Sequence, residues 1–88
     1  MPRFFFDVHD GASVLDEEGT ELPDVYAAQA AAIRTAGEIL RDLGPRFWDG
    51  VEWRMEVFDA RRRPLFVLRV SAEERLAPAE DRADPPGG

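Results

Sequence analysis

The sequence contains no cysteine, and it has a single histidine among its 88 residues. Without cysteine the chain has no disulfide framework, no thiolate nucleophile and no cysteine-based zinc site. No apolar run approaches the roughly 20 residues that a membrane-spanning helix requires. The apolar run at 4–6 is also too short for the hydrophobic part of a signal peptide. We therefore expect a cytoplasmic protein that has no membrane partner.

The charge balance is acidic, with a formal net charge of −7. Nucleic-acid binding requires a basic face that displaces counterions, so we expect no nucleic-acid partner. The length allows one domain, which we predict at 1–76, followed by a disordered tail at 77–88. A domain of this size buries only about 60% of its unfolded surface, so a subunit interface would add useful burial.

The spacing of apolar residues predicts four strands and one helix in the order β-β-α-β-β. The strands are expected at 3–9, 13–16, 51–59 and 64–70, where aromatic and β-branched residues alternate or run together. Apolar residues recur at helical spacing from 25 to 43, before a Gly-Pro stop signal. The simplest arrangement is an α+β fold, an antiparallel sheet with the helix on one face and spatial strand order 2-1-3-4.

The stretch from 16 to 24, D-E-E-G-T-E-L-P-D, carries five carboxylates in nine residues. The acids do not have the spacing of a calcium-binding loop, and a catalytic carboxylate pair would need burial that a turn does not offer. The structural interpretation explains more residues, with Gly19 in the turn and Asp24 as the helix N-cap. We expect no metal and no cofactor, although an acidic edge is also suited to a basic partner.

Two further groups carry candidate chemistry. His9 lies at a strand end without evident partners in the sequence, and such a histidine is more often structural than catalytic. Three consecutive arginines, Arg61, Arg62 and Arg63, are possible anion contacts, since guanidinium groups bind carboxylate or phosphate through paired hydrogen bonds. The simpler interpretation of this arginine run is the solvated tip of a hairpin.

An apolar surplus is the stronger functional indication. One helix covers one face of the sheet, yet the first and fourth strands are apolar on both faces. An exposed apolar patch marks an interface, and aromatic residues dominate interface energetics. The alternative is that loops and the C-terminal segment cover this surface. We predict a homodimer or an unknown protein partner, with sheet packed on sheet through Phe5, Phe58, Phe66 and Leu68.

The motifs M-P-R-F-F-F at 1–6, D-G at 10–11 and the acidic stretch at 16–24, followed by an alanine-rich helix and a closing hairpin, resemble a family of small bacterial proteins. The resemblance extends to about residue 70. That family is a domain of unknown function, so the resemblance implies no activity. The arginines at 61–63 depart from its pattern, which has a glycine-containing turn there. The Pro-Asp segment before the helix is also similar to HicB-type antitoxins, which have three strands before the helix instead of two.

The sequence thus favours a non-enzymatic protein-interaction domain that self-associates through an apolar sheet face. One alternative is a small antitoxin-like regulatory partner protein. The other is a carboxylate-dependent hydrolase that combines the acids at 16–24 with His9.

Overall fold

A computed structural model describes residues 1–50, 52–73 and 75. The predicted tail at 77–88 and the predicted strand residue Val51 lie outside the described residues. The elements, in chain order, are β1 Arg3–His9, β2 Ser13–Val14, β3 Thr20–Glu21, α1 Val25–Leu43, the 3-10 helix η1 Gly44–Asp49, β4 Trp53–Phe58 and β5 Pro64–Val70.

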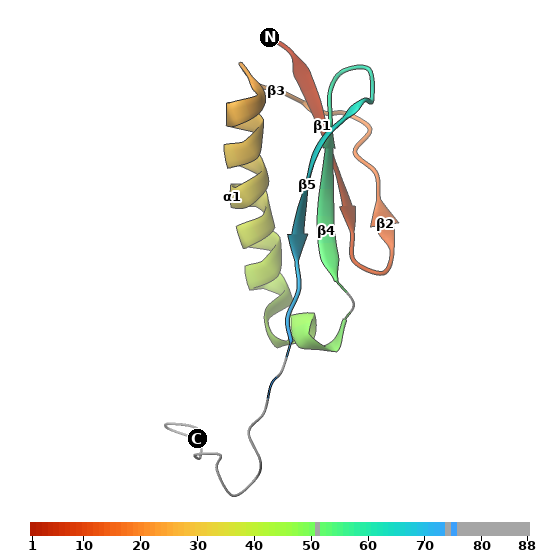
Figure 1. Cartoon of the computed structure of the whole chain (residues 1–88), viewed down its shortest axis with the longest axis vertical. Coiled ribbons are helices and arrows are strands. Elements are labelled where there is room, and N and C mark those ends of the chain that lie inside the picture. The colour runs from red at the N-terminus through yellow and green to blue at the C-terminus, as the bar shows by residue number, and fades with distance from the viewer. Residues whose placement is uncertain (51, 74, 76–88) are drawn as a thin grey trace, which may run out of the picture.

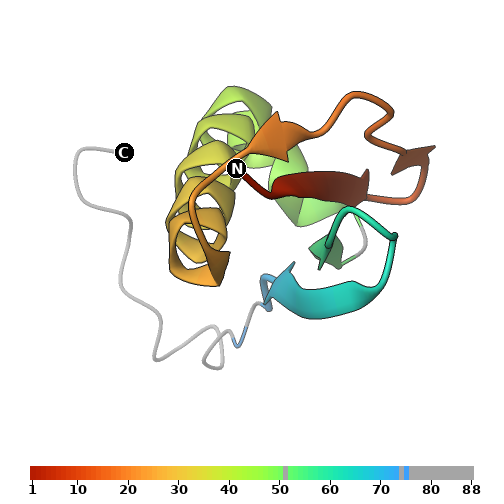
Figure 2. The same ribbon diagram turned by 90° about the horizontal axis from the view of Figure 1, so that it is seen from above.

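The strands form an antiparallel sheet in the order β2-β1-β4-β5, and the short β3 pairs with the beginning of β1. Helix α1 runs alongside this sheet (Figure 1). Seen from above, the helix covers one face only (Figure 2). The predicted α+β class and the order of the four predicted strands, now β2-β1-β4-β5, are both confirmed.

The core lies between α1 and the central strands. The fully buried residues of the helix are all alanines, and small side chains let its backbone lie close to the sheet. The bulk comes from the strands, chiefly from β4, where every second side chain is buried. Full burial of each large apolar side chain contributes about 1.5–3 kcal/mol. The buried apolar residues are Phe4, Ala28, Ala32, Ala36, Trp53, Met55 and Val57.

Both ends of α1 are fixed by local chemistry. Asp24 stands at the N-cap, where its Oδ1 accepts a hydrogen bond from the Ala27 backbone N–H at 2.8 Å. At the other end, Gly44 has a φ of +55° and its N–H donates to the Leu40 carbonyl. The left-handed conformation favours glycine, and the helix therefore stops where the sequence predicts.

The segment between β1 and α1 differs from the prediction. The second strand ends at Val14 instead of residue 16, because Asp16 uses its side chain to organise the following turn. The third strand, β3, was not predicted, because its two residues form a strand only through pairing with distant residues of β1. Three strands therefore precede the helix instead of the two predicted.

A β-bulge changes the orientation of β5. Phe58 lies opposite Pro64, but the preceding residue, Val57, lies opposite Phe66. One extra residue in a strand moves all later side chains to the other face of the sheet. Phe66 therefore faces α1 and packs against the core, and the prediction that it shares a face with Phe5 and Phe58 is wrong.

Candidate functional site

The sheet face opposite α1, here called the outer face, carries Phe5, Asp7 and His9 from β1. In β4 their cross-strand partners are Phe58, Glu56 and Arg54, respectively. Directly opposite residues in antiparallel strands project on the same side, so these six side chains form one surface. The outer face therefore has two phenylalanines at one end and four polar or charged side chains along the rest.

Arg62 covers the phenylalanine end of the outer face. Its guanidinium carbon lies 4.5 Å from the centre of the Phe5 ring and 5.3 Å from that of Phe58. These distances are within the range of cation–π attraction. Both rings are half-buried in the monomer, so the outer face is not the open apolar surface that the sequence indicated.

The same guanidinium is held by two acidic residues of the N-terminal segment. Nη1 donates to Asp7 Oδ2 at 2.8 Å, and Nη2 donates to the backbone carbonyl of Asp16. Arg62 has a φ of +59°, a conformation that costs a non-glycine residue about 1–2 kcal/mol. The contacts of the side chain offset this cost and fix the turn between β4 and β5.

The carboxylates of Asp7 and Asp16 accept hydrogen bonds from donors of this chain. Asp7 is only 4% exposed, and its second oxygen accepts the Asp16 N–H at 2.9 Å. Asp16 accepts the backbone N–H groups of Phe6, Glu18 and Gly19 at 3.1, 3.2 and 3.0 Å. These bonds support the structural interpretation of the acidic stretch, since its first carboxylate organises a turn.

Gly19 completes that turn because no larger residue fits. Its φ is +73°, and a Cβ built there would lie 2.8 Å from Arg3 Cγ and 3.0 Å from the Phe4 carbonyl oxygen. The backbone of the turn thus lies directly against β1. We call Asp7, Asp16, Gly19 and Arg62, with the rings of Phe5 and Phe58, the arginine cluster.

His9 has partners that the sequence did not suggest. Its Nδ1 lies 2.7 Å from Ser13 Oγ, and its Nε2 lies 3.1 Å from Glu56 Oε1. Among the described residues, no hydrogen bond or ion pair joins His9 to residues 16–24. Ser13 and Glu56 reach the same imidazole through the pairing of β1 with β2 and with β4, and the second of these pairings joins strands far apart in the sequence.

The three consecutive arginines have separate roles. Arg62 belongs to the arginine cluster, and Arg63 Nε donates to Asp59 Oδ2 at 2.8 Å. The backbone N–H of Arg63 also donates to this carboxylate, at 2.9 Å, and holds the pKa of Asp59 below its ordinary value. Two of the three predicted anion contacts therefore bind carboxylates of this chain, while Arg61 is exposed at the turn.

An apolar groove runs between α1 and β5, with a volume of about 310 Å³. Two of the four predicted interface residues, Phe66 and Leu68, form part of its wall. Ile33 lines it from the helix and remains 62% exposed, whereas Val67 borders it from β5 and directs its 43% exposed side chain to the outer face, opposite Glu56. The sequence places Ile33 beside the buried stripe of the helix, but only the fold shows that β5 lies next to it. The lining residues are Gln29, Ala32, Ile33, Phe66, Val67 and Leu68.

The edge of β5 that points away from β4 adjoins this groove. Within the described part of the chain, β5 pairs with β4 and with no other strand. A strand at the end of a sheet presents a row of unpaired backbone N–H and C=O groups. At seven residues β5 is far longer than β2, the two-residue strand at the opposite end of the sheet. The groove and this open edge form one continuous surface, which we call the β5 surface.

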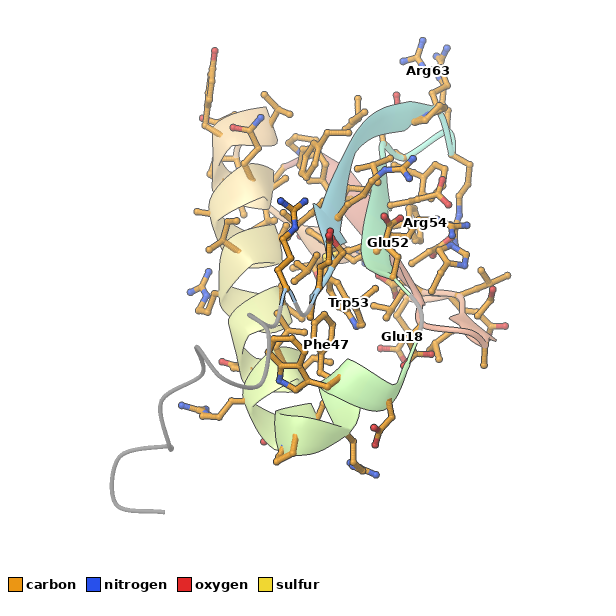
Figure 3. The ribbon with its side chains drawn as sticks, turned by 60° about the horizontal axis from the view of Figure 1, so that its bottom comes forward. Glu18, Phe47, Glu52, Trp53, Arg54 and Arg63 are labelled. Carbon is orange, nitrogen blue, oxygen red and sulfur yellow. The ribbon has the colours of Figure 1, made fainter. Side chains whose placement is uncertain are left out.

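A second, smaller cavity lies at the other end of the molecule, beside η1. Its volume is about 70 Å³, and it is bordered by Asp10, Leu43, Arg46, Phe47, Gly50 and Trp53. Figure 3 shows Trp53 next to Phe47, at the end of the molecule away from Arg63. Sites for small-molecule ligands usually measure about 300–1,000 Å³, so this cavity is too small for a substrate.

No three side chains among His, Cys, Asp and Glu come together as a metal ion would require in residues 1–50, 52–73 and 75. In that part of the chain, no helix is both long enough and apolar enough to cross a membrane.

The fold and its surfaces define a small α+β domain with one helix on an antiparallel sheet. The chain belongs to a family described as a domain of unknown function, DUF6894, whose model matches residues 3–71. This match confirms the resemblance to a family of unknown function. A search of the curated proteins and a search of the solved structures found no match.

Proposed function

We propose that this domain is a protein-interaction module that self-associates through the β5 surface. The observation that carries the proposal is the groove between α1 and β5, which leaves Ile33 and Val67 exposed beside an open strand edge. Exposed apolar surface that adjoins unpaired backbone is a template for another chain.

The chemistry of the groove favours a protein partner over a small polar substrate. Ligand sites use a few polar groups to orient what they bind. Among the lining residues, only Gln29 has a polar side chain. A neighbouring polypeptide instead obtains orientation from backbone hydrogen bonds along a strand and affinity from apolar side chains. The β5 surface offers both of these.

The outer face is the weaker candidate for self-association. Packing of sheet on sheet through Phe5 and Phe58 would require displacement of Arg62 from both rings. That displacement would leave the Asp7 carboxylate buried without its cation, which is costly. The groove of the β5 surface needs no such rearrangement, because its exposed side chains Ile33 and Val67 are apolar and hold no buried charge.

The test is size-exclusion chromatography coupled to light scattering, over a concentration series of the full chain. We expect a concentration-dependent dimer. Ile33→Glu places a charge in the groove and should give a monomer with unchanged circular dichroism. Thr35→Glu adds the same charge at an exposed position of α1 outside the groove lining, and this control should still dimerise. A wild-type chain that is monomeric at every concentration would refute the proposal, as would an Ile33→Glu variant that dimerises normally.

A further inference from the structure

We infer that two copies pair antiparallel through β5, with the two-fold axis at Val67, so that their sheets join into one. The inference rests on the proposed self-association and adds its geometry. Backbone groups along the open edge of β5 would pair with the same groups of the second copy. Such an isologous contact is self-complementary, because each strand offers the other the same surface.

The alternation of side chains restricts the register. A two-fold axis perpendicular to the sheet keeps both helices on the same face. Directly opposite residues in antiparallel strands also share a face. The residue nearest the axis must therefore lie opposite its own copy, and not opposite the copy of its neighbour. Phe66 then lies opposite Leu68 of the second copy, and both side chains face the helices. The two apolar grooves meet at the axis.

The length of β5 selects Val67 among the possible residues. The strand runs from Pro64 to Val70, so Val67 is its middle residue. With the axis there, all seven residues face a residue of the second β5. An axis at Phe66 or Leu68 would leave two residues at one end of each strand without an opposite residue. The central register therefore pairs the most backbone.

The charges at the two ends of β5 fit an antiparallel copy. The turn before β5 is basic and holds the exposed Arg61, while the segment after β5 holds Glu73, whose side chain is 70% exposed. Both residues lie just outside β5, one at each end, so an antiparallel copy brings the turn of one chain toward the segment after β5 of the other. Glu73 also lies 2.8 Å from Arg75 Nε, but an exposed pair of this kind contributes little and exchanges readily. Each basic turn thus lies beside an acidic segment of the second copy.

The other end of the sheet is a poor alternative for this pairing. Strand β2 has only two residues, Ser13 and Val14, and very short edge strands are one way in which proteins prevent edge-to-edge association. Val14 is nevertheless 66% exposed, more than Val67. The same residue type at both edges therefore provides a matched pair of positions for an experiment.

The absence of cysteine makes that experiment direct. Val67→Cys introduces the only thiol of the chain, and on a two-fold axis it faces its own copy. Opposite Cα atoms in antiparallel strands lie about 4.5–5.5 Å apart, within the range of about 4.4–6.8 Å that a disulfide spans. Under mild oxidation we expect Val67→Cys to form a covalent dimer at least about tenfold faster than Val14→Cys. Random collisions would instead favour the more exposed Val14→Cys.

The outcomes separate this inference from the proposed function. Dimers by light scattering with no preference for Val67→Cys would overturn pairing through β5 but leave self-association in place. A monomer at every concentration would overturn both. Arg61→Glu and Glu73→Arg should each weaken dimerisation about three- to tenfold, and the double variant should restore it. A double variant that dimerises no better than the single variants would overturn the proposed register.

Discussion

The arginine cluster and the β5 surface lie on opposite sides of the same hairpin and differ in what their polar groups bind. In the cluster, Asp7, Asp16 and Arg62 find their partners within the chain. Along the open edge of β5, the described residues supply no second strand. The hairpin is thus closed toward its own domain on one side and open toward another chain on the other.

This difference shows that aromatic content alone does not identify an interface. Phe5 and Phe58 are the larger side chains, yet a guanidinium stacks on both and half-buries them. Ile33 and Val67 are smaller, yet they remain exposed beside a groove. Substitutions in the cluster should therefore reduce the stability of the monomer, whereas those of the exposed β5-surface side chains Ile33 and Val67 should change it little.

The largest effect is expected for Arg62→Met, which keeps most of the packing over the rings but removes the charge. The Asp7 carboxylate would lose its cation while it stays buried, so we expect a loss of about 2–3 kcal/mol in unfolding free energy. Urea denaturation measures this change. The control is Arg34→Met, at an exposed position of α1, which should shift the unfolding free energy by less than about 0.5 kcal/mol. Equal stability of the two variants would show that Arg62 is not structural.

Gly19→Ala should lower the unfolding free energy by about 2 kcal/mol. The left-handed backbone disfavours alanine by about 1–2 kcal/mol, and the new Cβ would press against the Phe4 carbonyl oxygen. The matched control is Gly37→Ala in the exposed part of α1, where nothing lies within 4 Å of the added Cβ. That control should raise stability by about 0.5–1 kcal/mol. Thermal unfolding of both variants would contradict the model of the turn if they shift the midpoint in the same direction.

Asp24→Ala should cost about 1 kcal/mol, because the Ala27 N–H loses its acceptor at the start of α1. The effect should be confined to the first turn of the helix. Hydrogen exchange would show faster exchange for the first helical N–H groups and unchanged exchange in β4. Uniformly faster exchange throughout the domain would mean that the cap supports more than the end of the helix.

Val67→Thr tests the β5 surface and should have the smallest effect on the unfolding free energy. The two side chains have nearly the same shape, and Val67 is half-exposed in the monomer, so we expect less than about 0.5 kcal/mol. The measurement belongs at concentrations where light scattering shows a monomer. A loss as large as that of Arg62→Met would mean that the β5 surface is already covered within the monomer.

Local patterns predicted most of the fold. The helix from Val25 to Leu43 has the bounds that its apolar spacing, Asp24 and Gly44 indicate. Strand β4 alternates strictly and buries the residues that its period of two places on one face. These features depend on near neighbours in the chain, which is why the sequence alone indicates them.

The features that the sequence did not predict depend on contacts between distant residues. Strand β3 exists because Thr20 and Glu21 pair with β1. The orientation of Phe66 depends on a β-bulge, which shifts the strand register by one residue. No residue type in the sequence marks the position of this bulge. Arg62 was predicted only as a possible anion contact, because no local pattern indicates that it binds Asp7. The candidate surface was therefore predicted in part, through Phe66 and Leu68, while its location beside α1 was not.

The bond between Arg62 and Asp7 joins residues that are 55 positions apart, in the first and last parts of the described chain. Contacts of such long range form only after the intervening segments have assembled, so this bond should be missing from the transition state for folding. Its loss should accelerate unfolding and leave the refolding rate nearly unchanged. Stopped-flow kinetics of Arg62→Met would show this as a shift of the unfolding arm alone, whereas a slower refolding arm would mean that the bond forms early. If only the unfolding arm shifts, the arginine cluster mainly slows unfolding and so determines the lifetime of the folded domain.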